Sequence, residues 1–90
     1  MTDKVFIALQ NNEDARPIID AILEDNPEAI CNRSPGMVKI DVPGRLVVRR
    51  ETVTDKLGRD FDLQEIHVHL ISMSGNLDED EDEFVLHWRN

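Results

Sequence analysis

All three histidines of this 90-residue chain, His67, His69 and His87, fall in its last third. Two histidines spaced two residues apart point to one side of a β-strand, and a third from a neighbouring strand would complete a known zinc arrangement. Ile66 and Val68 alternate with the first two and form the more apolar face, so we expect the histidines to face outward. The place of His87 depends on strand register, which the sequence does not fix. Surface histidines are therefore expected, and a small metal- or ligand-binding domain is the alternative.

Six consecutive acidic residues beginning at Asp78 suggest calcium. Asp78, Asp80 and Asp82 occupy the first, third and fifth positions of an EF-hand loop. That loop also needs glycine at its sixth position and a bidentate glutamate at its twelfth, where this chain has Glu83 and Arg89. The run is also expected between strands, not helices. It therefore indicates a solvated acidic turn that keeps other strands from pairing with this edge.

Other catalytic motifs are missing from the sequence. There is no Gly-x-Ser-x-Gly and no glycine-rich phosphate loop, because the four glycines are spread singly, as in turns. The single cysteine, Cys31, has no partner for an internal disulfide, which fits a reducing cytoplasm. We expect no cofactor, no metal and no self-sufficient enzyme.

Length and charge limit the remaining classes of function. Ninety residues, of which 40% are hydrophobic, predict one domain (residues 1–90) with a small core. A net charge of −9 disfavours nucleic acid and anionic membranes as partners. No signal peptide or membrane span is expected. Residues 33–59 nevertheless carry a net charge of +4, and we call their seven bases the basic island: Arg33, Lys39, Arg45, Arg49, Arg50, Lys56 and Arg59.

Hydrophobic periodicity predicts strands at 4–9, 29–32, 37–42 and 45–50 and a first helix between the first two. Asp14 is a suitable N-cap for that helix, Pro17 suits its first turn, and Asn26 before a proline ends it.

The rest of the chain is expected to start with a helix at 52–58, capped by Thr52 or Thr54 and ended by Gly58. A short helical turn at 61–65 follows. The longest strand is predicted at 65–72 and a closing strand at 83–88. Helices and antiparallel strands then mix without a strict βαβ repeat, which predicts an α+β fold.

Several segments, in order, resemble the small effector, or coupling, proteins of bacterial multicomponent diiron monooxygenases, most closely those of phenol hydroxylases. The resemblance covers essentially the whole chain. Its most specific parts are LGRDFDLQE at residues 57–65, SMSGN after the following strand, and the ending LDEDEDEFVLHW. Two further segments resemble the family's opening strand and helix and its central strand pair leading into a helix. They are VFIALQNNEDARPIIDAILEDNPEA and MVKIDVPGRLVVRRETV.

This resemblance implies a cofactor-free, non-catalytic regulatory protein in the cytoplasm. It implies binding to an oxygenase component that holds a diiron site. Docking would tune substrate and O2 access to that site and the coupling of NADH use to hydroxylation. A separate reductase would compete for the same surface. The implied fold has two halves, βαββ and βααββ.

The resemblance also places partner-binding residues. The loop expected after the longest strand would lie against the oxygenase, with Met73 as the one large apolar side chain at its tip. That loop consists of Ser72, Met73, Ser74, Gly75 and Asn76. From charge alone, we expect four arginines of the basic island to assist docking: Arg33, Arg45, Arg49 and Arg50.

Overall fold

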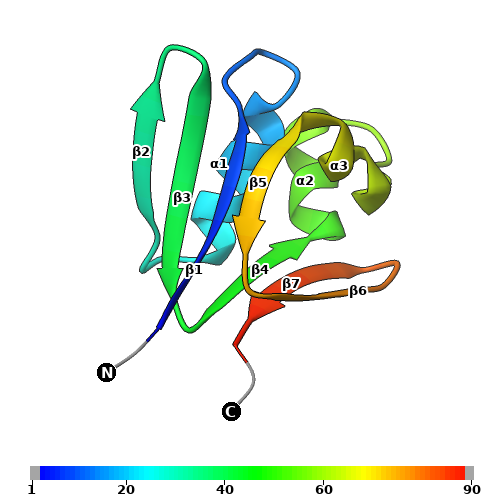
Figure 1. Ribbon diagram of the computed structural model, residues 1–90. Coiled ribbons are helices and arrows are strands. Elements are labelled where there is room, and N and C mark those ends of the chain that lie inside the picture. The colour runs from blue at the N-terminus through cyan, green and yellow to red at the C-terminus, as the bar shows by residue number, and fades with distance from the viewer. Residues whose placement is uncertain (1–2, 89–90) are drawn as a thin grey trace.

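The N-terminal strand lies inside the larger of two antiparallel sheets. In the computed structural model, which describes residues 3–88, β1 pairs with β3 on one side and β5 on the other (Figure 1). Val5, Ile7 and Leu9 alternate along β1 and are fully buried, because they face the helices. In pairing order the strands are β2 (Ile30–Ser34), β3 (Met37–Pro43), β1 (Lys4–Gln10) and β5 (Leu70–Ser74).

A smaller sheet closes the lower side of the molecule in Figure 1. Its middle strand pairs with the other two, and a tight acidic turn joins it to the strand before it. Leu46, Val48, Phe84 and Leu86 point from this sheet into the core and are fully buried. In pairing order the strands are β4 (Arg45–Arg49), β7 (Glu83–His87) and β6 (Asn76–Glu79).

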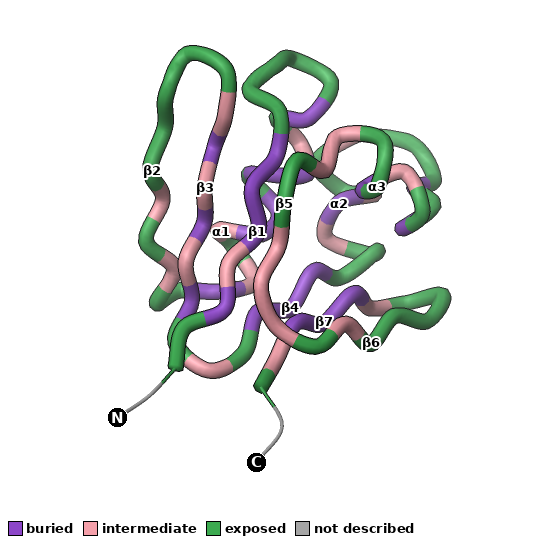
Figure 2. Tube along the Cα trace, viewed as in Figure 1, coloured by how far each residue is buried: buried purple, intermediate pink, exposed green. Residues whose placement is uncertain are grey.

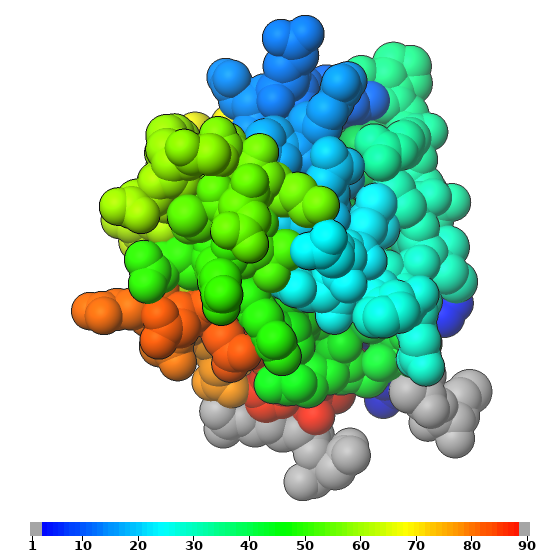
Figure 3. Space-filling model, turned by 180° about the vertical axis from the view of Figure 1, so that it is seen from behind, coloured from blue at the N-terminus to red at the C-terminus, as the bar shows by residue number. Residues whose placement is uncertain are grey.

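The helices cover one face of the larger sheet and leave its other face open (Figure 1). Seen from behind, α1 and α2 pack side by side over the core, and the acidic turn projects at one edge (Figure 3). The longest helix described in residues 3–88 has 10 residues, so none is long enough to cross a membrane. The helical elements are α1 (Arg16–Asp25), α2 (Arg50–Leu57), the 3-10 turn η1 (Leu63–Glu65) and α3 (Ile66–His69).

One hydrophobic core lies between the helices and both sheets. Figure 2 shows buried residues alternating with less buried ones along β1 and β3. The core cluster takes residues from α1, from both sheets and from the 61–66 segment. Both halves of the sequence therefore contribute to a single core, and the α+β class predicted from sequence is confirmed.

The predicted N-caps of both helices are wrong, although the helices themselves are confirmed. Helix α1 begins at Arg16, not after Asp14, and the amide of Ala15 donates to Asn12 Oδ1 at 2.8 Å. Asn12 therefore takes the role expected of Asp14, since either short polar side chain can accept from a free amide of the first turn. The predicted end of α1 at Asn26 is confirmed.

Helix α2 begins at Arg50, so neither Thr52 nor Thr54 is its cap. The Thr52 hydroxyl instead donates to Asp25 Oδ1 at 2.9 Å, and the Thr54 hydroxyl accepts from the amide of Phe61 at 3.3 Å. Both hydroxyls therefore bond to residues outside the helix and do not cap it. Gly58 ends the helix in the left-handed conformation, with φ of 75°, as predicted.

The predicted long strand at 65–72 is wrong. Residues 66–69 form α3, and only residues 70–74 form a strand. Asp62 and Glu65 explain the difference by making a capping box: the Asp62 side chain accepts from the Gln64 amide at 2.9 Å, and Glu65 accepts from the Asp62 amide at 3.3 Å. This local pattern starts a helical turn in a segment with strand-like alternation.

The two predicted halves need one revision. The first half is βαββ, as expected, but the second half gains a strand, β6, between β5 and β7. Strand β5 also leaves its own half to pair with β1. The halves are therefore interlocked and do not correspond to the two sheets.

Asn26 joins α1 to the smaller sheet. Its side chain is buried, and its Nδ2 donates to the carbonyls of Ile22 and Val47, each at 2.7 Å. The Val47 amide donates to Asn26 Oδ1 at 2.9 Å. Asn26 thus satisfies both backbone groups of Val47 on the edge of β4 that faces away from β7.

Replacing Asn26 by alanine should be strongly destabilising. The change leaves the amide and carbonyl of Val47 buried without their side-chain partner, which costs about 1–3 kcal/mol for each group. We expect the free energy of unfolding to fall by about 2–4 kcal/mol in urea denaturation. Asn32→Ala, on the exposed strand β2, is the matched control and should change it by about 0.5 kcal/mol or less. Equal losses for the two variants would contradict this role of Asn26.

Candidate docking surface

The segment expected to be a docking loop is mostly strand. Ser72, Met73 and Ser74 belong to β5 and lie opposite Ala8, Ile7 and Phe6 of β1. Gly75 forms the corner, and Asn76 begins β6. The loop prediction is therefore wrong, because backbone pairing with β1 continues to Ser74. What the segment presents is a rigid strand and a sharp corner.

Met73 does not lie at a loop tip. It is opposite the buried Ile7, is itself half-buried, and packs against the hydrophobic core. A substitution at Met73 would therefore disturb the core as well as any partner contact. The neighbouring Ser72, exposed, and Ser74, half-buried, face the other side, which is the open face of the larger sheet.

Gly75 is the most constrained residue of this corner. Its φ is 125°, which side-chain-bearing residues rarely adopt. A Cβ on Gly75 would lie 2.9 Å from Val5 Cγ1, inside the core. The corner therefore needs glycine both for its backbone conformation and for the close approach of β1.

The first two histidines lie on a helical turn and do not share a strand face. His67 and Val68 are exposed and His69 is half-buried, whereas Ile66 is fully buried. Val68 was expected to point into the core with Ile66. Instead its exposed fraction is 71%, because the helical turn rotates successive side chains by about 100° and not by the 180° of a strand.

Two histidines pair with neighbouring acids of β6. His67 Nε2 lies 3.2 and 3.3 Å from the two carboxylate oxygens of Glu79, and it packs at 5.9 Å from the ring of Phe84. His87 pairs with Asp78 on the other side of the same strand. Within residues 3–88, no three His, Cys, Asp or Glu side chains come together as a metal site. Among the described residues, the zinc and calcium alternatives therefore find no ligand set.

The basic island is largely used inside the molecule. Lys39, Lys56 and Arg59 form ion pairs with Asp41, Glu24 and Glu65. Of the four arginines expected to assist docking, two also pair with acids. Arg49 Nε lies 3.6 Å from Glu83 Oε2, and Arg50 Nη2 lies 3.4 Å from Asp82 Oδ1.

The other two candidates, Arg33 and Arg45, make no ion pair with any residue between 3 and 88 and are both exposed. They lie on different sheets, Arg33 on β2 and Arg45 on β4. The basic island is therefore not one continuous surface.

The acidic turn has a structural role beside α2. Asp80 Oδ1 accepts the amides of Asp82 and Glu83, each at 2.8 Å, and these bonds lower the pKa of the Asp80 carboxyl. The carbonyl of Asp82 then accepts the amide of Arg50, at the first residue of α2. The turn thus satisfies a free amide at the start of the helix.

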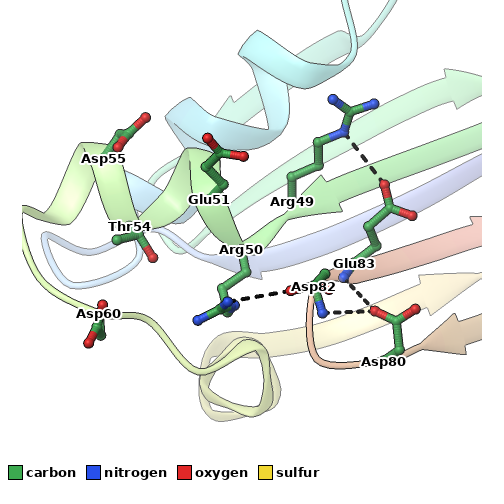
Figure 4. Close-up of a pocket in the computed structure, with 9 residues that line it drawn as sticks. All are labelled: Arg49, Arg50, Glu51, Thr54, Asp55, Asp60, Asp80, Asp82 and Glu83. Atoms are coloured by element: carbon green, nitrogen blue, oxygen red, sulfur yellow. Dashed lines mark hydrogen bonds and ion pairs between the residues drawn. The ribbon is translucent and has the colours of Figure 1, made fainter.

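Figure 4 shows the groove between this turn and α2. The groove has a volume of about 610 Å³, and its lining includes two arginines and six acids. The Arg49–Glu83 and Arg50–Asp82 pairs cross it. Because the arginines already meet carboxylates, an acidic partner would have to displace these pairs to reach them.

Sequence reasoning missed the exposure of Val68, which is 71% exposed. Two signals in the sequence point to this region. One is the capping-box pattern at Asp62 and Glu65. The other is the stretch of residues 66–77, which we call the uncharged segment. It contains no Asp, Glu, Lys or Arg in a chain that is 32% charged. Interface centres are depleted in charge in the same way.

Comparison with known proteins gives a consistent set of matches. Residues 3–87 match the MmoB/DmpM family. The chain is 48% identical, over the full length of both, to the phenol 2-monooxygenase stimulatory component DmpM of Pseudomonas sp. (strain CF600).

Solved structures agree with these sequence matches. A chain in a structure of a phenol hydroxylase–regulatory protein complex superimposes with a TM-score of 0.93 and 47% identity, covering 97% of this chain and all of that one. The soluble methane monooxygenase regulatory protein B gives a TM-score of 0.76 at 21% identity, covering 99% of this chain and 67% of that one. The second match, at this low identity, shows the fold alone.

Gly75→Ala should destabilise the corner. The new methyl group would meet Val5 and the backbone would leave its preferred region, so we expect a loss of about 1–3 kcal/mol in the free energy of unfolding. Gly36→Ala is the matched control, because a Cβ at Gly36 would meet no atom within 4 Å. Thermal and urea unfolding measure both variants. A Gly75→Ala protein as stable as Gly36→Ala would show that the corner tolerates a side chain.

Proposed function

We propose, from the premise that the chain belongs to the MmoB/DmpM family, that it is the regulatory component of a phenol hydroxylase and binds the hydroxylase component. The resemblance seen in the sequence is thus confirmed at the level of the family. One observation carries the proposal: the structural match, over 97% of this chain, to a chain in a structure of a phenol hydroxylase–regulatory protein complex. The protein is a non-catalytic effector, and the oxygenase component carries out the chemistry.

The effect on the partner follows from differential binding. An effector shifts a conformational equilibrium only by binding one state of its partner more tightly than another. We propose that docking favours one state of the oxygenase. In that state, substrate and O2 gain access to the active site, and NADH use is coupled to hydroxylation. A rigid effector suits this role, since a preorganised surface loses little freedom on binding. The reductase component competes for an overlapping surface on the oxygenase.

We propose that the corner after β5 contributes to docking, as the resemblance implies. Ser72 and Asn76 are exposed there, and Ser74 and Gly75 are half-exposed. Met73 supports the strand from its inner side. Hydroxyl and amide groups on a rigid strand give adaptable hydrogen bonds in a fixed position.

Among the arginines, we propose that Arg33 and Arg45 contact the oxygenase directly, because their charges are not used within the described chain. Arg49 and Arg50 join only if the partner displaces Glu83 and Asp82. We also propose that residues 1–90 act as one effector domain and that the protein works in the cytoplasm, together with its oxygenase and reductase.

Reconstitution tests the proposed function. The chain alone should form no catechol from phenol and NADH. Added to a phenol hydroxylase oxygenase component and its reductase, it should raise the rate of catechol formation and the catechol formed per NADH consumed. The Asn26→Ala variant, heated above its unfolding temperature, is the inactive control. No change in either quantity on adding the folded protein would contradict the proposal.

A further inference from the structure

A second groove lies at the end of α2, whereas the acidic turn meets the start of that helix. It has a volume of about 500 Å³ and runs between the start of α1, the end of α2 and α3. These three elements lie close together at one end of the molecule (Figure 1). We call it the α3 groove, and it is lined by Glu13, Asp14, Pro17, Ile18, Leu57, Arg59, Phe61, Glu65, Val68 and His69.

The inner surface of the α3 groove is apolar. Ile18 and Phe61 belong to the core and are almost fully buried, and Leu57 packs against that core. Val68 forms part of the lining but is 71% exposed, the highest value of the four exposed large apolar residues among those described. The groove thus offers an apolar contact that no part of residues 3–88 covers.

The charges of the α3 groove are unbalanced. Arg59, its one cation, pairs with Glu65 at 3.3 Å and donates to the carbonyl of Asp60. That pairing lowers the pKa of the Glu65 carboxyl. Glu13 and Asp14 are exposed, and their carboxylates form no ion pair with any residue between 3 and 88. Two free carboxylates therefore stand beside an apolar surface.

We propose that the α3 groove is a docking site for a segment of the oxygenase component that carries an apolar side chain next to a lysine or arginine. The apolar side chain packs against Val68, and the cation meets Glu13 and Asp14. This inference rests on the proposed function for the identity of the partner. It adds a contact on α1, α2 and α3 that is separate from the corner after β5 and from the four arginines proposed above to assist docking.

Charge distinguishes this partner from a second copy of the chain. Each copy carries a net charge of −9, and most of its basic island is already paired, so a second copy offers few free cations to the groove.

Four residues that line the α3 groove come from the segment LGRDFDLQE: Leu57, Arg59, Phe61 and Glu65. Gly58 and the Asp62–Glu65 capping box hold that segment in place.

Val68→Lys tests the apolar contact. It replaces the exposed valine with a cation that occupies the groove and neutralises its carboxylates. Ile30→Lys is the matched control, because Ile30 is 52% exposed on β2, at the far edge of the larger sheet. Both variants should keep the wild-type melting temperature within a few degrees. The concentration giving half-maximal stimulation of catechol formation should rise at least tenfold for Val68→Lys and less than twofold for Ile30→Lys.

Asp14→Asn tests the charge, with Asp20→Asn on the exposed face of α1 as its control. Direct titration against the oxygenase at two salt concentrations should show a weaker salt dependence for Asp14→Asn alone. If wild type neither binds nor stimulates, the proposed function fails. If wild type binds and Val68→Lys matches Ile30→Lys, the α3 groove is not the docking site. Dimerisation of the free chain that Val68→Lys abolishes would assign the groove to a second copy and overturn the inference.

Discussion

Asn26 gives the free edge of β4 the two hydrogen-bond partners that a neighbouring strand would otherwise supply. Asp25 continues this edge by accepting the Arg49 amide at 3.2 Å and the Thr52 hydroxyl at 2.9 Å. Two adjacent residues at the end of α1 thereby fix the smaller sheet and the first turn of α2. Since the acidic turn in turn meets the start of α2 at Arg50, the position of the β6–β7 hairpin also depends on this contact.

This framework explains why so many of the charged side chains are paired with other residues of the same molecule. The acids around residues 78–83 build a turn, satisfy a helix amide and pair with Arg49 and Arg50. Glu79 reaches across to His67 and so ties α3 to the hairpin. Within residues 3–88, the uncharged segment, the α3 groove beside it, and Arg33 and Arg45 remain free for a partner. An interface with an uncharged centre and an acidic border fits a partner whose own surface is basic.

Hydrophobic periodicity predicted most of the fold because most elements have one buried face. The strands near 4–9, 37–42 and 45–50 and the face of α1 were correct for that reason. The 66–69 turn was missed because Ile66, Val68 and Leu70 alternate like a strand, while the capping box of the preceding residues 62–65 starts a helix. The pairing of β5 with β1 and the partners of the arginines depend on contacts distant in sequence, which no local pattern contains.

Hydrogen–deuterium exchange on the chain with and without its oxygenase tests the central claim, that docking uses the uncharged segment and the α3 groove. Amides of α3 and of the free edge of β5 should exchange in the free protein, because few buried contacts protect them. With the oxygenase present, exchange should slow over residues 57–77 and remain unchanged over residues 20–25 of α1. Protection of other segments with no change over residues 57–77 would place the docking surface elsewhere and contradict the account.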